Sequence, residues 1–117
     1  MRRITVLCVG KLKEKFYADA AAEYIKRLSR YCKLDVIELP ETRLPEDPSP
    51  AEIQKALAAE ANAIRQKLEA GAVVAMCIEG KTCSSEALSK KLADFALEGK
   101  SRVTFLIGGS FGLDETL

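Results

Sequence analysis

Two glycine-containing segments hold the residues whose types and spacing could do chemistry. Residues 79–82 (EGKT) and 108–112 (GGSFG) each follow a short apolar run that resembles a buried strand. Ligands of open α/β sheets bind beyond the carboxyl ends of strands, and glycine lets the backbone approach a ligand closely. We therefore expect a binding site at these segments. The alternative is that the glycines only make tight turns.

The second segment also fits the pattern G-x-S-x-G, in which a nucleophilic serine stands on a turn between a strand and a helix. Ser110 would then need a histidine to accept its proton. The chain contains no histidine, so a serine hydrolase stays an alternative only if a residue outside this sequence supplies the base. We expect Ser110 to act instead as a hydrogen-bonding residue of the loop.

The first segment resembles the end of a phosphate-binding P-loop, G-x-x-x-x-G-K-[ST]. Gly80, Lys81 and Thr82 fit that end. The glycine required five positions before Gly80 is replaced by Ala75, inside an apolar run. A P-loop is therefore excluded here.

Length and composition favour one globular domain over residues 1–117, with 48% hydrophobic and 30% charged side chains. No apolar run reaches the roughly 18 residues of a membrane span, and the apolar start is too short for a secretory signal. The four cysteines lie at positions 8, 32, 77 and 83 without a C-x-x-C pair. We expect unpaired thiols in a reducing cytoplasm, with no metal site and no membrane partner.

Basic side chains gather near the N-terminus, although the whole chain has a net charge of only +1. Residues 1–33 hold nine Lys or Arg against three acids. Such a segment is typical of a surface that faces phosphates, and a solvated protein face is the alternative. The candidates for contacts with nucleic-acid phosphates are Lys11, Lys13, Lys15, Arg27 and Arg30.

Apolar runs alternate with segments of helical period, which predicts an α/β fold with a mostly parallel sheet and helices on both faces. We expect strands at residues 3–9, 34–39, 72–78 and 103–107. The run at 72–78 lacks alternation, which is typical of a strand covered on both faces.

Three helices are expected between these strands. The residues that recur at helical steps in the first are Tyr17, Ala20, Ala21, Tyr24, Ile25, Leu28 and Tyr31. Ser49 and Glu52 form a capping box for the second, with Pro50 at its first position. We expect the second helix to end near Gly71 and to bury Ile53, Leu57, Ile64 and Leu68.

The third helix is expected to begin at Ser84 or Ser85 and to end at Gly99. Asp114 has the character of a fourth helix cap, with Glu115 suited to a first turn. Because the sequence ends at Leu117, we expect it to be cut short at its C-terminus.

Four segments resemble the ribosomal large-subunit methyltransferase H family of the SPOUT superfamily. They are residues 4–15 (ITVLCVGKLKEK), 22–28 (AEYIKRL), the end of the run at 78–81 (IEGK), and 105–113 (FLIGGSFGL). Their order and spacing together are specific, and the resemblance covers the whole length.

The resemblance implies an enzyme that uses S-adenosylmethionine to methylate N3 of a pseudouridine in 23S rRNA, in the large ribosomal subunit or the 70S ribosome. It also implies a homodimer and a C-terminal trefoil knot, a rare exception to the usual topology rules. It places cofactor-binding stretches at Met76 and at Gly108 and Gly109, with a third expected after Leu117. Without that third stretch and the knot, we expect weak or absent binding of S-adenosylmethionine.

The residues themselves agree with such a site. Met76 and Ile107 would supply apolar walls, and a side chain at position 108 would occupy ligand space. Methyl transfer mainly requires alignment, since the sulfonium already makes its methyl group electrophilic. No residue is a persuasive acceptor for the N3 proton, so we assign no catalytic residue. A non-catalytic RNA-binding module is the second alternative.

Overall fold

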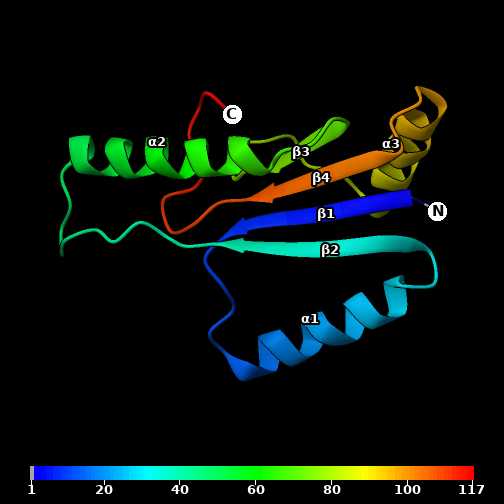
Figure 1. Ribbon diagram of the computed structural model, residues 1–117, viewed down its shortest axis with the longest axis horizontal. Coiled ribbons are helices and arrows are strands. Elements are labelled where there is room, and N and C mark those ends of the chain that lie inside the picture. The colour runs from blue at the N-terminus through cyan, green and yellow to red at the C-terminus, as the bar shows by residue number, and fades with distance from the viewer. Residues whose placement is uncertain (1) are drawn as a thin grey trace.

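The computed structural model describes residues 2–117 as a four-stranded sheet with three helices (Figure 1). The elements are β1 (Arg2–Val9), α1 (Lys15–Leu28), β2 (Cys32–Leu39), α2 (Pro50–Lys67), β3 (Ala72–Met76), α3 (Ser85–Leu97) and β4 (Arg102–Ile107). The sheet order is β2-β1-β4-β3, and every neighbouring pair is parallel. The predicted α/β fold is confirmed.

All four strands end at the same edge of the sheet. Val9 of β1 pairs with Leu39 of β2, and Ile107 of β4 pairs with both Cys8 and Met76. The segments that follow the four strands therefore leave the sheet close to one another. Any site at this edge can combine residues from distant parts of the sequence.

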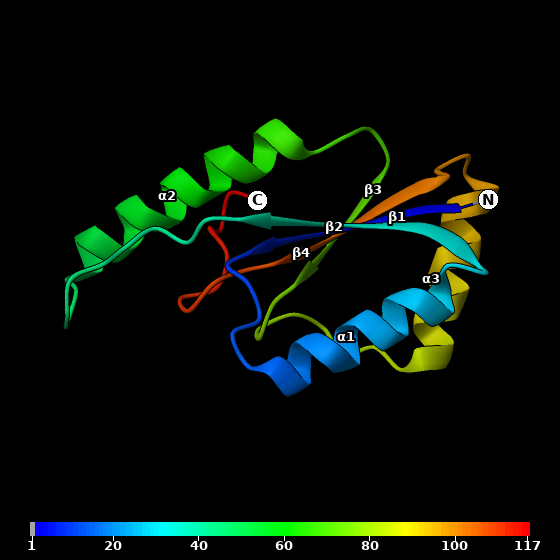
Figure 2. The ribbon, with the colours of Figure 1, turned by 60° about the horizontal axis from the view of Figure 1, so that its bottom comes forward.

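α2 covers one face of the sheet (Figure 2) and supplies its side of the core. The predicted capping box is confirmed: the Glu52 N–H donates to the Ser49 hydroxyl, and the Ser49 N–H donates to the Glu52 carboxylate. The helix ends at Lys67, before Gly71. The buried core residues between α2 and the sheet are Leu7, Val9, Leu39, Ile64 and Leu106.

The second helix buries a slightly different set of residues from the one predicted. Leu57 and Ile64 are buried as expected, whereas Ile53 and Leu68 are half-buried near the two ends of α2. Ala56, Glu60 and Ala61 complete the buried face.

The opposite face of the sheet is more open. α1 lies on this side (Figure 2), and α3 lies near the end of the sheet where β1 and β4 begin (Figure 1). The helical period of the first helix is confirmed, but α1 buries none of its side chains and Tyr31 lies beyond its end. Tyr17 and Tyr24 are 57% and 64% exposed. α1 therefore contributes no buried side chain to the core.

β3 is shorter and more exposed than expected. It ends at Met76, and the next residues form a turn in which the Gly80 N–H donates to the Cys77 carbonyl at 3.2 Å. Only Ala72 of the strand is buried. The prediction of a strand at residues 72–78 covered on both faces is therefore wrong, because β3 lies at the edge of the sheet and has β4 as its main neighbour.

The remaining elements begin and end close to the predicted residues. Ser84 caps α3 by accepting a hydrogen bond from the Ala87 N–H at 3.0 Å, and Gly99 follows the helix at a positive φ of 82°. Asp114 accepts hydrogen bonds from the N–H and hydroxyl of Thr116, but residues 115–116 form a turn, and the described residues contain no helix after Asp114. Within residues 2–117, no helix is both long and apolar enough to cross a membrane.

Removing core volume at Leu106 should destabilise the fold strongly. Leu106 is 1% exposed, whereas Leu97 at the end of α3 is 87% exposed. We expect Leu106→Ala to lower the free energy of unfolding by about 2–5 kcal/mol. The matched change Leu97→Ala should alter it by less than about 0.5 kcal/mol. Urea denaturation followed by circular dichroism measures both, and similar losses for the two variants would contradict this description of the core.

Candidate functional site

The bends after β3 and β4 meet in one cavity at the carboxyl edge of the sheet. This strand-end cavity has a volume of about 400 Å³. It is lined by Met76, Cys77, Ile78, Glu79, Ile107, Gly108, Gly109, Ser110, Phe111, Gly112 and Leu113. The structure thus brings together the four residues for which we predict contact with a cofactor, namely Met76, Ile107, Gly108 and Gly109.

Exposed apolar side chains form much of the wall of this cavity. Met76 and Ile107 are register partners on adjacent strands, and they are 56% and 43% exposed. Ile78 and Phe111 are exposed beside them. A group of exposed apolar side chains in a concave site is typical of a surface that a ligand or partner covers.

The glycine loop, residues 108–112, folds back on itself. Gly109 and Gly112 form an antiparallel bridge, with the Gly112 N–H donating to the Gly109 carbonyl at 3.1 Å. A Cβ atom at position 108 would lie 2.4 Å from the Gly112 carbonyl oxygen. The loop's own backbone therefore requires glycine at 108, which is a different reason from the ligand space that we expected.

Glu41 is the residue of this edge that the sequence did not single out. Its Oε1 accepts hydrogen bonds from the N–H and the hydroxyl of Ser110, at 3.0 and 2.8 Å. These bonds lower the pKa of the Glu41 carboxyl, and the positive charge of Lys13 adds to that effect. Glu41 follows the end of β2, so applying the strand-end rule to β2 as well would have found it.

Ser110 therefore has the role of a hydrogen-bonding loop residue, as predicted. Its hydroxyl donates directly to a carboxylate whose pKa is lowered. Such a carboxylate is a weak base and is poorly suited to activating a serine. This geometry disfavours the hydrolase alternative.

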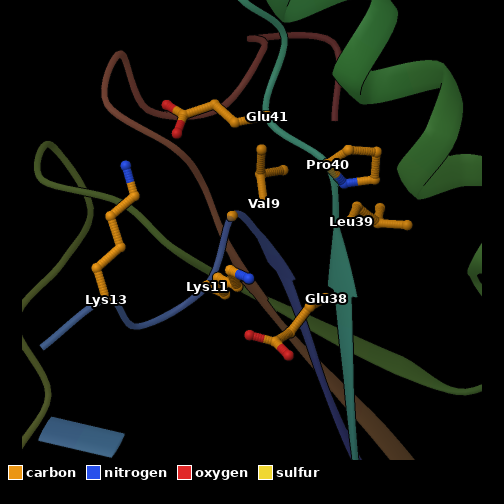
Figure 3. A pocket seen from close by; sticks show the side chains of 8 residues that line it. Val9, Lys11, Lys13, Glu38, Leu39, Pro40 and Glu41 are labelled. Atoms are coloured by element: carbon orange, nitrogen blue, oxygen red, sulfur yellow. The ribbon is translucent and has the colours of Figure 1, made fainter. Parts of the chain in front are cut away.

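A second cavity lies between the ends of β1 and β2. This lysine cavity has a volume of about 490 Å³ and is lined by Val9, Gly10, Lys11, Lys13, Glu38, Leu39, Pro40 and Glu41. Figure 3 shows Lys13 reaching toward Glu41 across its rim. The cavity therefore brings two of the predicted phosphate-binding lysines, Lys11 and Lys13, to the edge that carries the glycine loop.

The other predicted phosphate contacts lie on α1 or just beyond its end. Lys15 pairs with Asp19 at 3.7 Å, and Arg27 pairs with Glu23 at 3.0 Å. Both ion pairs are exposed, so they are weak and leave the basic groups open to solvent. Arg30 is exposed beyond the end of α1.

The four cysteines are all unpaired, as expected. Burial raises the pKa of the Cys8 thiol, and the nearby carboxylate of Glu38 adds to this increase. A thiol with a raised pKa is less reactive at neutral pH. In the described part of the chain, no group of three or more Cys, Asp or Glu side chains is arranged to hold a metal ion.

The chain is similar to methyltransferases along nearly its whole length. A family model described as "Predicted SPOUT methyltransferase" matches residues 2–117. Proteins named ribosomal RNA large subunit methyltransferase H are 46% identical in Streptococcus equi subsp. zooepidemicus and 47% identical in Streptococcus suis. The one from Acetivibrio thermocellus is 45% identical. Each match covers 98% of this chain and 73% of the relative.

Two neighbouring glycines of the loop should respond differently to an added methyl group. At Gly108 the new Cβ would meet the backbone of Gly112 at 2.4 Å, whereas at Gly109 it would meet the Glu41 carboxylate at 2.8 Å. A side chain can move aside more easily than backbone. We expect Gly108→Ala to cost about 1–3 kcal/mol and Gly109→Ala no more than about 1 kcal/mol. Thermal unfolding of both variants tests this order, and a costlier Gly109→Ala would contradict it.

Proposed function

The chain belongs to the SPOUT methyltransferase family, and we propose that it methylates N3 of a pseudouridine in 23S rRNA with S-adenosylmethionine as the methyl donor. The names of its relatives give large-subunit rRNA methylation as their activity, and the identity to them is 45–47%. The observation that carries the proposal is the strand-end cavity, in which the bends after two parallel strands form neighbouring walls.

The residues of this cavity suit a nucleoside. Its volume of about 400 Å³ lies within the range typical of small-molecule sites. Met76 and Ile107 offer apolar side chains to a flat ring, and the backbone of Gly108 and Gly109 offers polar groups to ring edges and ribose hydroxyls. When bound, S-adenosylmethionine supplies an electrophilic methyl group.

The lysine cavity suits the rRNA side of the reaction. Lys11 and Lys13 are exposed at the same edge as the glycine loop. Phosphates supply most of the sequence-independent attraction between proteins and nucleic acids. We assign these two lysines to rRNA phosphates near the target nucleotide.

The proposal includes the wider setting of the enzyme. Residues 1–117 belong to one methyltransferase domain, and the protein acts in the cytoplasm on the large subunit or the 70S ribosome. It works as a homodimer. The apolar side chains that α1 leaves exposed support an association between copies, since such surfaces are usually covered.

Methyl transfer by the full-length protein is the direct test. Labelled S-adenosylmethionine should transfer its methyl group to undermethylated ribosomes, and nucleoside analysis of the 23S rRNA should place the label on N3 of a pseudouridine. Labelling of Ser110 by a serine-reactive phosphonate would favour a hydrolase instead. Salt-dependent binding of rRNA, with no protection of Gly108 by added donor, would favour a non-catalytic module.

A charge in the apolar wall should weaken donor binding. Ile107 lines the strand-end cavity, whereas Val73 is outside it and has a similar exposed fraction, 45% against 43%. We expect Ile107→Asp to raise the Kd for S-adenosylmethionine at least about tenfold, because an unpaired carboxylate replaces an apolar contact. Val73→Asp is the matched control and should change it less than about twofold. Isothermal titration of the full-length variants measures both, and equal effects would place the donor elsewhere.

A further inference from the structure

We propose that Glu41 is a positioning residue for the methyl-donor site, because its carboxylate holds the glycine loop in the shape that lines the strand-end cavity. The identity of the ligand rests on the proposed function. The claim that Glu41 orders the glycine loop rests only on contacts within this chain.

Although Glu41 is exposed, its carboxylate accepts both hydrogen bonds that Ser110 can donate. Both donors of Ser110 point to one carboxylate oxygen, Oε1, at 3.0 and 2.8 Å. Hydrogen bonds to a charged acceptor are about twice as strong as those between neutral groups. The loop is therefore tied at its middle residue, both by its backbone and by its side chain.

The carboxylate occupies space that Gly109 leaves open, and it lies within van der Waals distance of the position that a Cβ atom would take at Gly10. A Cβ atom at Gly109 would lie 2.8 Å from Oε1, and one at Gly10 would lie 3.6 Å from Oε2. The carboxylate thus lies between the segments that follow β1 and β4, although it comes from the segment that follows β2. Glu41 therefore comes from the end of β2, hydrogen-bonds the segment after β4 and lies beside the segment after β1.

The segment that carries Glu41 is itself anchored. The Thr42 N–H donates to Oε2 of Glu60 at 3.0 Å, and Glu60 is only 9% exposed on α2. On the other side, the Gly10 N–H donates to the Leu39 carbonyl at 2.7 Å. With both flanks held, Glu41 can fix the loop rather than follow its movements.

The negative charge of Glu41 suits a residue that holds the glycine loop better than one that transfers a proton. The Ser110 hydrogen bonds lower the pKa of this carboxyl, followed by the charge of Lys13. The other charged groups around it are Lys11 and Glu38 in the lysine cavity and Arg43 in the next hollow. Because the pKa of Glu41 is lowered in the folded state, its carboxylate stabilises the fold fully above the ordinary glutamate pKa. This stabilisation is lost as the pH falls through the lowered value.

The test compares Glu41→Ala, Glu41→Gln and the control Glu38→Gln in the full-length protein. Glu38 is an acid of the same cavity, and it lies outside the strand-end cavity. Isothermal titration gives the Kd for S-adenosylmethionine, and steady-state kinetics separates KM from kcat. We expect the Kd and donor KM to rise about tenfold in Glu41→Ala and about threefold in Glu41→Gln, which keeps an acceptor oxygen. The donor Kd of Glu38→Gln should stay within about twofold, and kcat at saturating donor should fall less than about threefold in the two Glu41 variants.

A second readout does not depend on the ligand. Hydrogen exchange of the Ser110 amide should be at least about tenfold faster in Glu41→Ala than in wild type, and unchanged in Glu38→Gln. An unchanged Kd in Glu41→Ala, or an equal loss in Glu38→Gln, would overturn the proposal. If wild type binds no S-adenosylmethionine, the proposed function fails, and the Ser110 amide alone then decides whether Glu41 holds the loop.

Discussion

The pairing of β4 with strands on both of its sides is the constraint on which the rest of the structure depends. β4 is hydrogen-bonded to β1 on one side and to β3 on the other, and Val103 and Leu106 are buried within it. Parallel pairing forces neighbouring strands to end at a common edge. The glycine loop must therefore emerge next to the turn after β3. Without that register, the residues of the strand-end cavity would have no reason to meet.

At the carboxyl edge of the sheet, one face packs against the core and the other lines the strand-end cavity. Leu106 points to the face that α2 covers, and Ile107, the next residue, points to the open face because strand residues alternate. Leu113 then packs back against the core at the far end of the loop. The loop thus lies between the buried Leu106 and the half-buried Leu113, while Met76, Ile107 and Phe111 of the cavity stay accessible. An open apolar wall supported by a packed core is what a preformed ligand site requires.

Sequence reasoning succeeded where the physics is local or follows from a general rule. The capping box at Ser49 needs only residues within one helical turn, and the meeting of the two bends follows from parallel strands. Sequence reasoning failed where the answer depends on the order of strands in the sheet. The run at 72–78 has the pattern of a strand covered on both faces, but β3 lies at the edge of the sheet and is mostly exposed. The contact between Glu41 and Ser110 joins positions 69 residues apart. No local pattern marks such a pair, and only the strand-end rule applied to every strand would have brought them together.

A binding loop has to be ordered without being covered, and the polar contacts around Glu41 meet that requirement. Packing would order the loop more strongly, but it would also fill the space in front of it. An exposed carboxylate can hold the loop backbone from one side, in the space that Gly109 leaves by having no side chain. Because Glu41 is exposed, water screens these hydrogen bonds, and each contributes less than the about 1.5–3 kcal/mol typical of a charged acceptor. The loop therefore belongs to the less stable part of the fold, from which ligand-binding segments are generally drawn, and its order depends on the anchoring of Thr42 to the buried Glu60 of α2.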